Sequence, residues 1–159
     1  MTDAPHARGQ RADWSSVPGE IVATIQTELG GEVVHVMSMT GGFSPGIAAR
    51  IETATGRRAF VKAVSAARNP VAPTFHRREI LVASHMPNDA RLPVPPLLWS
   101  HDEGGDGWVV LVFADIDGHQ PAQPWVESEL DRVIAALDDL ATALTPSPIA
   151  AGTVGSASE

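Results

Sequence analysis

One charged residue in an otherwise apolar run is the first feature of this sequence that could do chemistry. Residues 59–64 favour a strand, and every side chain in the run except that of Lys62 is apolar. Such a run is typical of a strand that is covered on both faces. An ammonium group is costly to bury unless an opposite charge pairs with it. The sequence therefore predicts a carboxylate close to Lys62.

The segment that follows offers this carboxylate on a predicted helix. Over residues 74–86, Glu79 falls on the same helical face as apolar residues at spacings of three and four. These apolar residues are Phe75, Val82, Ala83 and Met86. Thr74 is the expected N-cap, and Pro87 ends the pattern. We expect Lys62 and Glu79 to form an ion pair between strand and helix.

A glycine-rich turn lies upstream, between two runs at 32–39 and 47–52 that favour strands. Residues 41–46 read Gly-Gly-Phe-Ser-Pro-Gly. One interpretation is an ordinary hairpin turn, in which glycine supplies positive φ angles. The other is a loop whose backbone N–H groups cradle a phosphate. The strand that carries Lys62 is the second predicted strand after this loop, and this closeness in the chain favours the phosphate interpretation.

Taken together, these residues resemble the nucleotide-binding lobe of the aminoglycoside phosphotransferase family, whose fold is that of the protein kinases. In kinases a glycine-rich loop covers the phosphates of ATP, and a strand lysine holds them and pairs with a helix glutamate. The resemblance implies an ATP site in which Lys62 is that lysine and Glu79 its partner. The loop residues that it assigns to the nucleotide are Gly41, Gly42, Ser44 and Gly46. Their spacing departs from the protein-kinase pattern and is closer to the looser form of small-molecule phosphotransferases.

The resemblance also gives a role to the segment after the last apolar run. Residues 108–113 favour a buried strand, and 114–118 follow it directly. In the family this position is the hinge, whose backbone groups bond the adenine edge, here at about Ala114 and Ile116. Asp115 and Asp117 could instead form a carboxylate metal pair, because residues two apart on a strand share a face. The place directly after a buried strand favours the hinge, and no metal ligand is assigned.

The order of predicted elements indicates an α+β fold. A helix at 18–29 precedes strands at 32–39, 47–52, 59–64, 97–100 and 108–113, with the helix at 74–86 between the third and fourth strands. Short turns between strands imply antiparallel pairing. With the resemblance, this predicts a kinase-like small lobe: a five-stranded antiparallel sheet with a crossing helix. The expected domains are a disordered tail (1–13), the nucleotide-binding lobe with its hinge (14–118), a first helical segment of a second lobe (119–145) and a tail or linker (146–159).

The segment at 124–144 predicts one long helix with an apolar stripe. The stripe residues are Val126, Leu130, Val133, Leu137, Leu140 and Leu144, at spacings of three and four. As the first helix of a second lobe, it would normally pack against that lobe. Without it, the stripe is expected to bind a partner, either a separate second-lobe chain or another copy of this chain.

The amino-acid composition argues against several classes of function. The length of 159 residues suits one domain, or one lobe with tails. A net charge of −8 argues against a general nucleic-acid binder, and the absence of cysteine excludes disulfides and thiolate metal sites. No apolar run reaches the roughly 18 residues of a membrane helix, so no membrane partner is expected and a cytoplasmic location is the default.

The residues that would catalyse phosphoryl transfer are not found. None of the six histidines has aspartate two positions later, as the family's catalytic loop would require. The expected function is therefore the ATP-binding part of a small-molecule phosphotransferase, truncated before its catalytic loop, with Mg²⁺ bound only together with the second lobe. No catalytic residue is assigned. The alternative is a non-catalytic interaction module or truncated remnant that uses the apolar face at 126–144.

Overall fold

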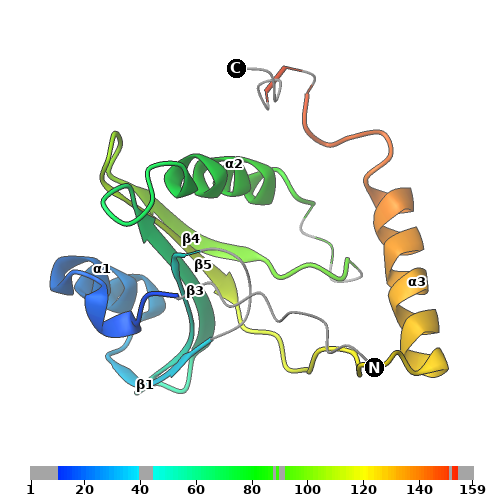
Figure 1. The fold of residues 1–159 in the computed structure, drawn as a ribbon, viewed down its shortest axis with the longest axis horizontal. Helices are drawn as coiled ribbons and strands as arrows, with labels where there is room; N and C mark the ends of the chain where they lie inside the picture. Colours follow the sequence, from blue (N-terminus) through cyan, green and yellow to red (C-terminus); the bar gives the residue numbers. More distant parts are fainter. Residues whose placement is uncertain (1–10, 40–44, 88, 90–91, 151, 154–159) are drawn as a thin grey trace, which may run out of the picture.

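The protein forms one five-stranded antiparallel sheet with helices on both of its faces (Figure 1). The computed structural model describes residues 11–39, 45–87, 89, 92–150 and 152–153. The strands are β1 (Val33–Ser38), β2 (Ile47–Thr53), β3 (Arg58–Ser65), β4 (Leu97–Asp102) and β5 (Trp108–Ala114). They lie in the order β1-β2-β3-β5-β4, and every neighbouring pair is antiparallel. The predicted α+β class is confirmed, and the arrangement is consistent with a kinase-like small lobe.

The helices are α1 (Gly19–Leu29), α2 (Ala72–Ser84) and α3 (Glu127–Ala143), with a short 3₁₀ turn at Trp14–Ser16 before α1. Helix α1 ends where Gly30 adopts a left-handed φ of 72°, as the sequence predicts for the glycine pair. None of the described helices combines the length and the apolar character that crossing a lipid bilayer requires.

The two central strands, β3 and β5, are apolar because helices cover both faces of the sheet. One face packs against α1, through Ile21, Ile25 and Leu29 of that helix. The strand residues of this core include Ile47, Ala49, Ile51, Val61, Ala63, Val110 and Val112. The other face packs against α2 and contains Val64, Val109, Leu111 and Phe113. Alternation along β3 thus divides its side chains between two cores, and Lys62 lies on the face of α2.

Strand β1 does not follow the predicted alternation. Strict alternation over 32–39 predicts Val33, His35, Met37 and Met39 on one face, but the pairing with β2 shifts register between Val33 and His35. This bulge changes the phase, so that Val33 and Val36 pack against the core of α1 while Met37 is 52% exposed. The prediction of that face was wrong because the pattern of residue types gives no sign of the extra residue.

Helix α2 begins earlier than predicted. It starts at Ala72, and the side-chain oxygen Oδ1 of Asn69 accepts hydrogen bonds from the backbone N–H groups of Val71 and Ala72 at 3.0 Å each. Thr74 is therefore inside the helix, and its prediction as N-cap was wrong. The helix is also rotated relative to the predicted face. Phe75 is 61% exposed, whereas the sheet is contacted by Ala72, Ile80 and Ala83.

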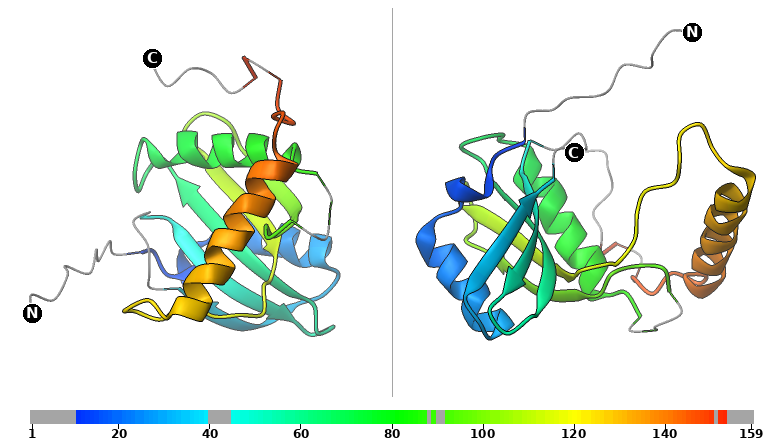
Figure 2. Two further views of the ribbon diagram at one scale, coloured as in Figure 1. Left: turned by 90° about the vertical axis from the view of Figure 1, so that its right-hand side faces the viewer. Right: turned by 90° about the horizontal axis from the view of Figure 1, so that it is seen from below.

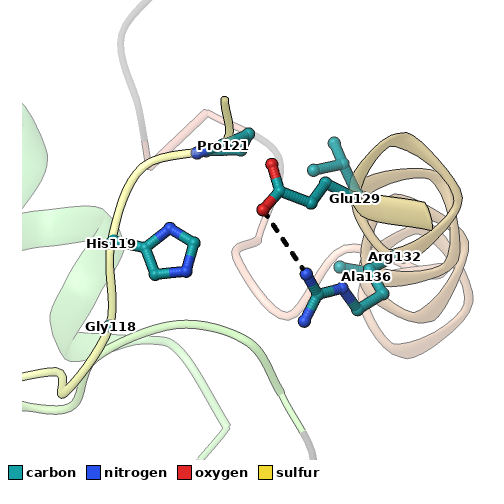
Figure 3. A pocket seen from close by; sticks show the side chains of 7 residues that line it. Gly118, His119, Pro121, Glu129, Arg132 and Ala136 are labelled. Carbon is teal, nitrogen blue, oxygen red and sulfur yellow. Dashed lines mark ion pairs between the residues drawn. The ribbon is translucent and has the colours of Figure 1, made fainter. Parts of the chain in front are cut away.

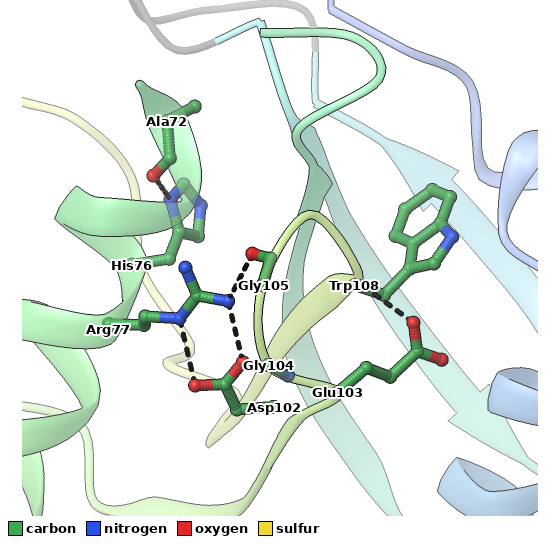
Figure 4. Close-up of polar contacts among 8 residues, drawn as sticks. All are labelled: Ala72, His76, Arg77, Asp102, Glu103, Gly104, Gly105 and Trp108. Carbon is green, nitrogen blue, oxygen red and sulfur yellow. Dashed lines mark hydrogen bonds and ion pairs between the residues drawn. The ribbon is translucent and has the colours of Figure 1, made fainter. Parts of the chain in front are cut away.

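An arginine on the outer side of α2 ties the helix to the hairpin between β4 and β5 (Figure 4). Arg77 donates from Nε and Nη2 to the two carboxylate oxygens of Asp102, and from Nη2 to the carbonyl of Gly105, each at 2.9 Å. Its hydrogen bonds lower the pKa of Asp102. Arg77 thus helps to fix where α2 lies on the sheet.

Helix α3 stands apart from the sheet and its two covering helices (Figures 1 and 2). It begins at Glu127, three residues later than predicted, and contains no buried residue. The apolar stripe is present but open. Val126 is 49%, Leu130 39% and Leu137 58% exposed, and Ile134 beside them is 49% exposed.

The bulge in β1 predicts effects of different size on stability for two neighbouring substitutions. Val36→Asp places a charge against the core and should lower the free energy of unfolding by about 1–3 kcal/mol. Met37→Asp places the same charge at an exposed site and should change it by less than about 0.5 kcal/mol. Urea unfolding of both variants measures this difference. A larger loss from Met37→Asp would show that the alternation predicted from the sequence, and not the bulge, holds in solution.

Candidate functional site

The predicted ion pair between Lys62 and Glu79 is confirmed. Lys62 Nζ lies 2.5 Å from Glu79 Oε2. Lys62 is in the middle of the sheet, with Ala48 of β2 opposite it on one side and Leu111 of β5 on the other. Glu79 reaches it from the second turn of α2, which crosses this face. The pair therefore joins the central strand to the helix that covers it.

The pair is more open than the sequence suggests. The Lys62 side chain is 25% exposed and that of Glu79 is 37% exposed, although the surrounding strand residues are buried. An ammonium group has three N–H donors, and the contact with Glu79 uses one of them. The remaining donors can bind an anion that approaches from solvent. Lys62 is also the only lysine of the sequence.

The glycine-rich loop cannot be compared with the structure over most of its length. Gly41, Gly42 and Ser44 lie outside the described residues. Gly46 is described and directly precedes β2, whose Ala48 is paired with Lys62. Gly46, the last residue of the loop, thus lies two residues before Ala48, which is paired with Lys62. A contact of these residues with phosphate stays a prediction.

The predicted hinge begins with Ala114, the last residue of β5, and two backbone groups of its residues are engaged within the chain. The N–H of Ala114 donates to the carbonyl of Pro96 at 2.9 Å. The carbonyl of Ile116 accepts from Arg50 Nη2 at 2.7 Å. A base that binds along 114–116 would have to use other backbone groups or displace these bonds. The role of Ala114 and Ile116 in base binding stays a prediction.

Asp115 serves an ion-pair cluster and is not arranged as a metal ligand. Its carboxylate is 5% exposed and contacts two arginines, Arg58 of β3 and Arg50 of β2. Arg50 Nε lies 2.9 Å from the enclosed Oδ1, but the contact lacks hydrogen-bond alignment. Within the described residues no three His, Cys, Asp or Glu side chains gather as a metal site would need. The cluster fixes segment 114–116 to the sheet.

Sequence reasoning missed His76, which lies one helical turn before Glu79. Its ring is 4% exposed, and Nδ1 is 3.0 Å from the carbonyl of Ala72 (Figure 4). Burial lowers the pKa of His76, and the charge of Lys62 acts in the same direction, against the hydrogen bond to Ala72 and the charge of Glu79. The spacing from Ala72 to Ile80 through His76, at steps of four, is the signal that could have found it.

A hollow whose lining does not include Lys62 lies between segment 118–121 and α3 (Figure 3). Its volume is about 300 Å³, and its polar lining residues are His119, Glu129 and Arg132. Glu129 faces Arg132 at 3.8 Å, but the Arg132 side chain is 74% exposed. Such an exposed pair in an open hollow does not form a preorganised site. We therefore assign the candidate site to Lys62 and Glu79.

Likeness of this chain to known proteins was found among solved structures. No protein-family model and no curated protein matches it. A solved structure to which it is similar is the crystal structure of a "putative fructosamine-3-kinase" from Thermobifida fusca YX-ER1. The two are 24% identical with a TM-score of 0.46, over 67% of this chain and 34% of that chain. This chain spans about a third of the length of that structure.

Burial of His76 predicts a pH dependence of stability. Because its folded pKa lies below the ordinary value of 6.5, the unfolded chain binds a proton there that the folded chain does not bind. Stability should therefore fall as the pH drops below about 6.5, by at most about 1.4 kcal/mol per pH unit from this residue. His76→Gln should remove this part of the slope between pH 7 and 5, as measured by urea unfolding. The exposed His35 gives the control, His35→Gln, and equal slopes for wild type and His76→Gln would contradict the prediction.

Proposed function

We propose that this chain is the nucleotide-binding part of a phosphotransferase that acts on a hydroxyl group of a small molecule. The observation that supports this most is the Lys62–Glu79 pair, which presents a cation at the centre of the sheet with access for an anion. An ion pair that only stabilised the fold could equally lie at the edge of the sheet. Here the only lysine of the chain is held beside the end of a glycine-rich loop.

In this proposal Lys62 binds phosphate oxygens of ATP and Glu79 keeps its ammonium group in place. A charge-assisted hydrogen bond from ammonium to phosphate is stronger than one between neutral groups. The loop residues Gly41, Gly42, Ser44 and Gly46 add backbone donors to the same phosphates. Segment 114–116 lies at the end of β5 and provides the place for the base, held there by Asp115.

Transfer of the phosphoryl group needs further groups that this proposal does not place in the chain. The reaction requires a magnesium ion that bridges phosphate oxygens and a residue that orients or deprotonates the acceptor. The described residues offer no cluster of acidic side chains that fits magnesium. We propose that a second lobe supplies both, either in a longer form of the protein or as a separate chain.

The single lysine allows a direct test of the phosphate site. Limiting N-hydroxysuccinimide acetate can modify only Lys62 and the terminal amine, which peptide mass spectrometry separates. Millimolar ATP should slow acetylation of Lys62 by about fivefold or more while the terminal amine reacts as before. In calorimetry, ATP binding should weaken at least tenfold in Lys62→Met, as expected from the loss of one charge-assisted bond of about 1.5–3 kcal/mol.

Two controls separate binding from folding. Because the pair is partly exposed, Lys62→Met should change the free energy of unfolding by less than about 1 kcal/mol. Arg68→Met removes an exposed cation shortly after β3 and should bind ATP like the wild type. Unchanged ATP binding by folded Lys62→Met, or no protection of Lys62 by ATP or any other nucleoside triphosphate, would refute the proposed site.

The open apolar face of α3 favours a second candidate function, an interaction module. Exposure of Leu130, Ile134 and Leu137 on one helix is unusual for a chain that acts alone. The partner is proposed to be a second-lobe chain or another copy of this chain. This function differs from nucleotide binding because it should survive Lys62→Met.

Substitution on the apolar face of α3 tests whether copies of this chain associate with one another. If copies associate through this face, Leu137→Asp should make the protein monomeric in sedimentation velocity, because a charge would be buried at the contact. Ala135→Asp adds the same charge away from the stripe and should associate like the wild type. Both variants should bind ATP normally. A wild type that stays monomeric at every concentration would leave only a separate second lobe as partner.

A further inference from the structure

Arg50 lies on the same face of the sheet as Lys62, where a base would lie if the phosphates sit on Lys62. In the β2–β3 pairing Ala48 is opposite Lys62 and Arg50 is opposite Phe60. Cross-strand partners share a face, and Phe60 and Lys62 are two residues apart on β3. The two positions are therefore about 7 Å apart along the strand. Lys62 marks the phosphate end of this face and Arg50 the end next to segment 114–116.

The guanidinium of Arg50 changes what segment 114–116 offers to a base. It donates to the Ile116 carbonyl at 2.7 Å, which takes up one of the two lone pairs of this acceptor. The nearby carboxylate of Asp115 is enclosed and paired with Arg50 and Arg58. Arg50 itself is 33% exposed and uses one of its five N–H groups in a hydrogen bond, to the Ile116 carbonyl, while its Nε forms an ion pair with Asp115. Its remaining N–H groups are donors that can reach a ligand.

Donors at this edge select bases that present an acceptor. The exocyclic group at position 6 of adenine is an amine, which donates, whereas that of guanine and hypoxanthine is an oxygen, which accepts. The Ile116 carbonyl already accepts a hydrogen bond from Arg50 and has less capacity left for the adenine amine, whereas an arginine N–H can donate to the 6-oxygen. We infer that Arg50 makes this site prefer 6-oxopurine nucleoside triphosphates over ATP. This inference rests on the proposed nucleotide site.

Protection of Lys62 gives the test in the wild-type protein. ATP and inosine triphosphate are compared as protectants against acetylation of Lys62, because hypoxanthine differs from adenine in the group at position 6 and the proton on the adjoining N1, and lacks the 2-amino group of guanine. We expect half-protection by inosine triphosphate at a concentration at least about fivefold lower than by ATP, and GTP should behave like inosine triphosphate. Equal protection, or better protection by ATP, would overturn the inference while the proposed nucleotide site stands. Protection by none of the three would refute the proposed site and the inference with it.

A variant assigns the preference to Arg50. Arg50→Met keeps an unbranched side chain, removes the donors and uncovers the Ile116 carbonyl, so the two triphosphates should protect within about twofold of each other. Arg57→Met, at an exposed turn position before β3, removes the same charge and should keep the preference. Circular dichroism checks that each variant is folded. A preference that persists in folded Arg50→Met would overturn the role of Arg50, and the wild-type comparison decides the base preference even if that variant does not fold.

Discussion

One ammonium group paired with one carboxylate joins the central strand of the sheet to helix α2. Lys62 is in a central strand, with β2 and β5 on either side, so its side chain can leave the sheet only towards one of the covering helices. Glu79 meets it at 2.5 Å. The small side chains of Ala72 and Ala83 bring α2 close to the sheet, and Arg77 fixes its outer side to the β4–β5 hairpin. Each of these contacts restricts the position of Glu79.

The two faces of the sheet have different chemistry because their helices cover them to different extents. The face of α1 is closed, with Ile25, Ala49, Val61 and Val110 fully buried. The face of α2 includes both the partly exposed Lys62 and the partly exposed Arg50. Apolar side chains stabilise the sheet from the first face, and the second face keeps two cations within reach of an anionic ligand. This separation allows the sheet to be stable without closing the candidate site.

The end of β5 shows how charge holds an irregular segment in place. Asp115 is nearly enclosed, and its two arginines come from β2 and β3, more than fifty residues earlier in the chain. A buried carboxylate without such partners would be costly, so the cluster restricts where segment 114–116 can lie. The same arginine that stabilises the segment also covers its carbonyl at Ile116. Arg50 therefore both stabilises segment 114–116 and affects which polar groups of this segment remain for a ligand.

The sequence by itself determined the elements, the sheet class and the Lys62–Glu79 pair, because runs of apolar residues, glycine turns and one charge in an apolar strand are local patterns. It did not determine the phase of β1, the start of α2 or the burial of His76. Those depend on a bulge opposite β2 and on which side of the helix meets the sheet. Nor could it show that Arg50 reaches the Ile116 carbonyl, 66 residues away in the chain. Such contacts arise only when the strands pair, so the tertiary structure alone decided which polar groups the candidate site leaves for a ligand.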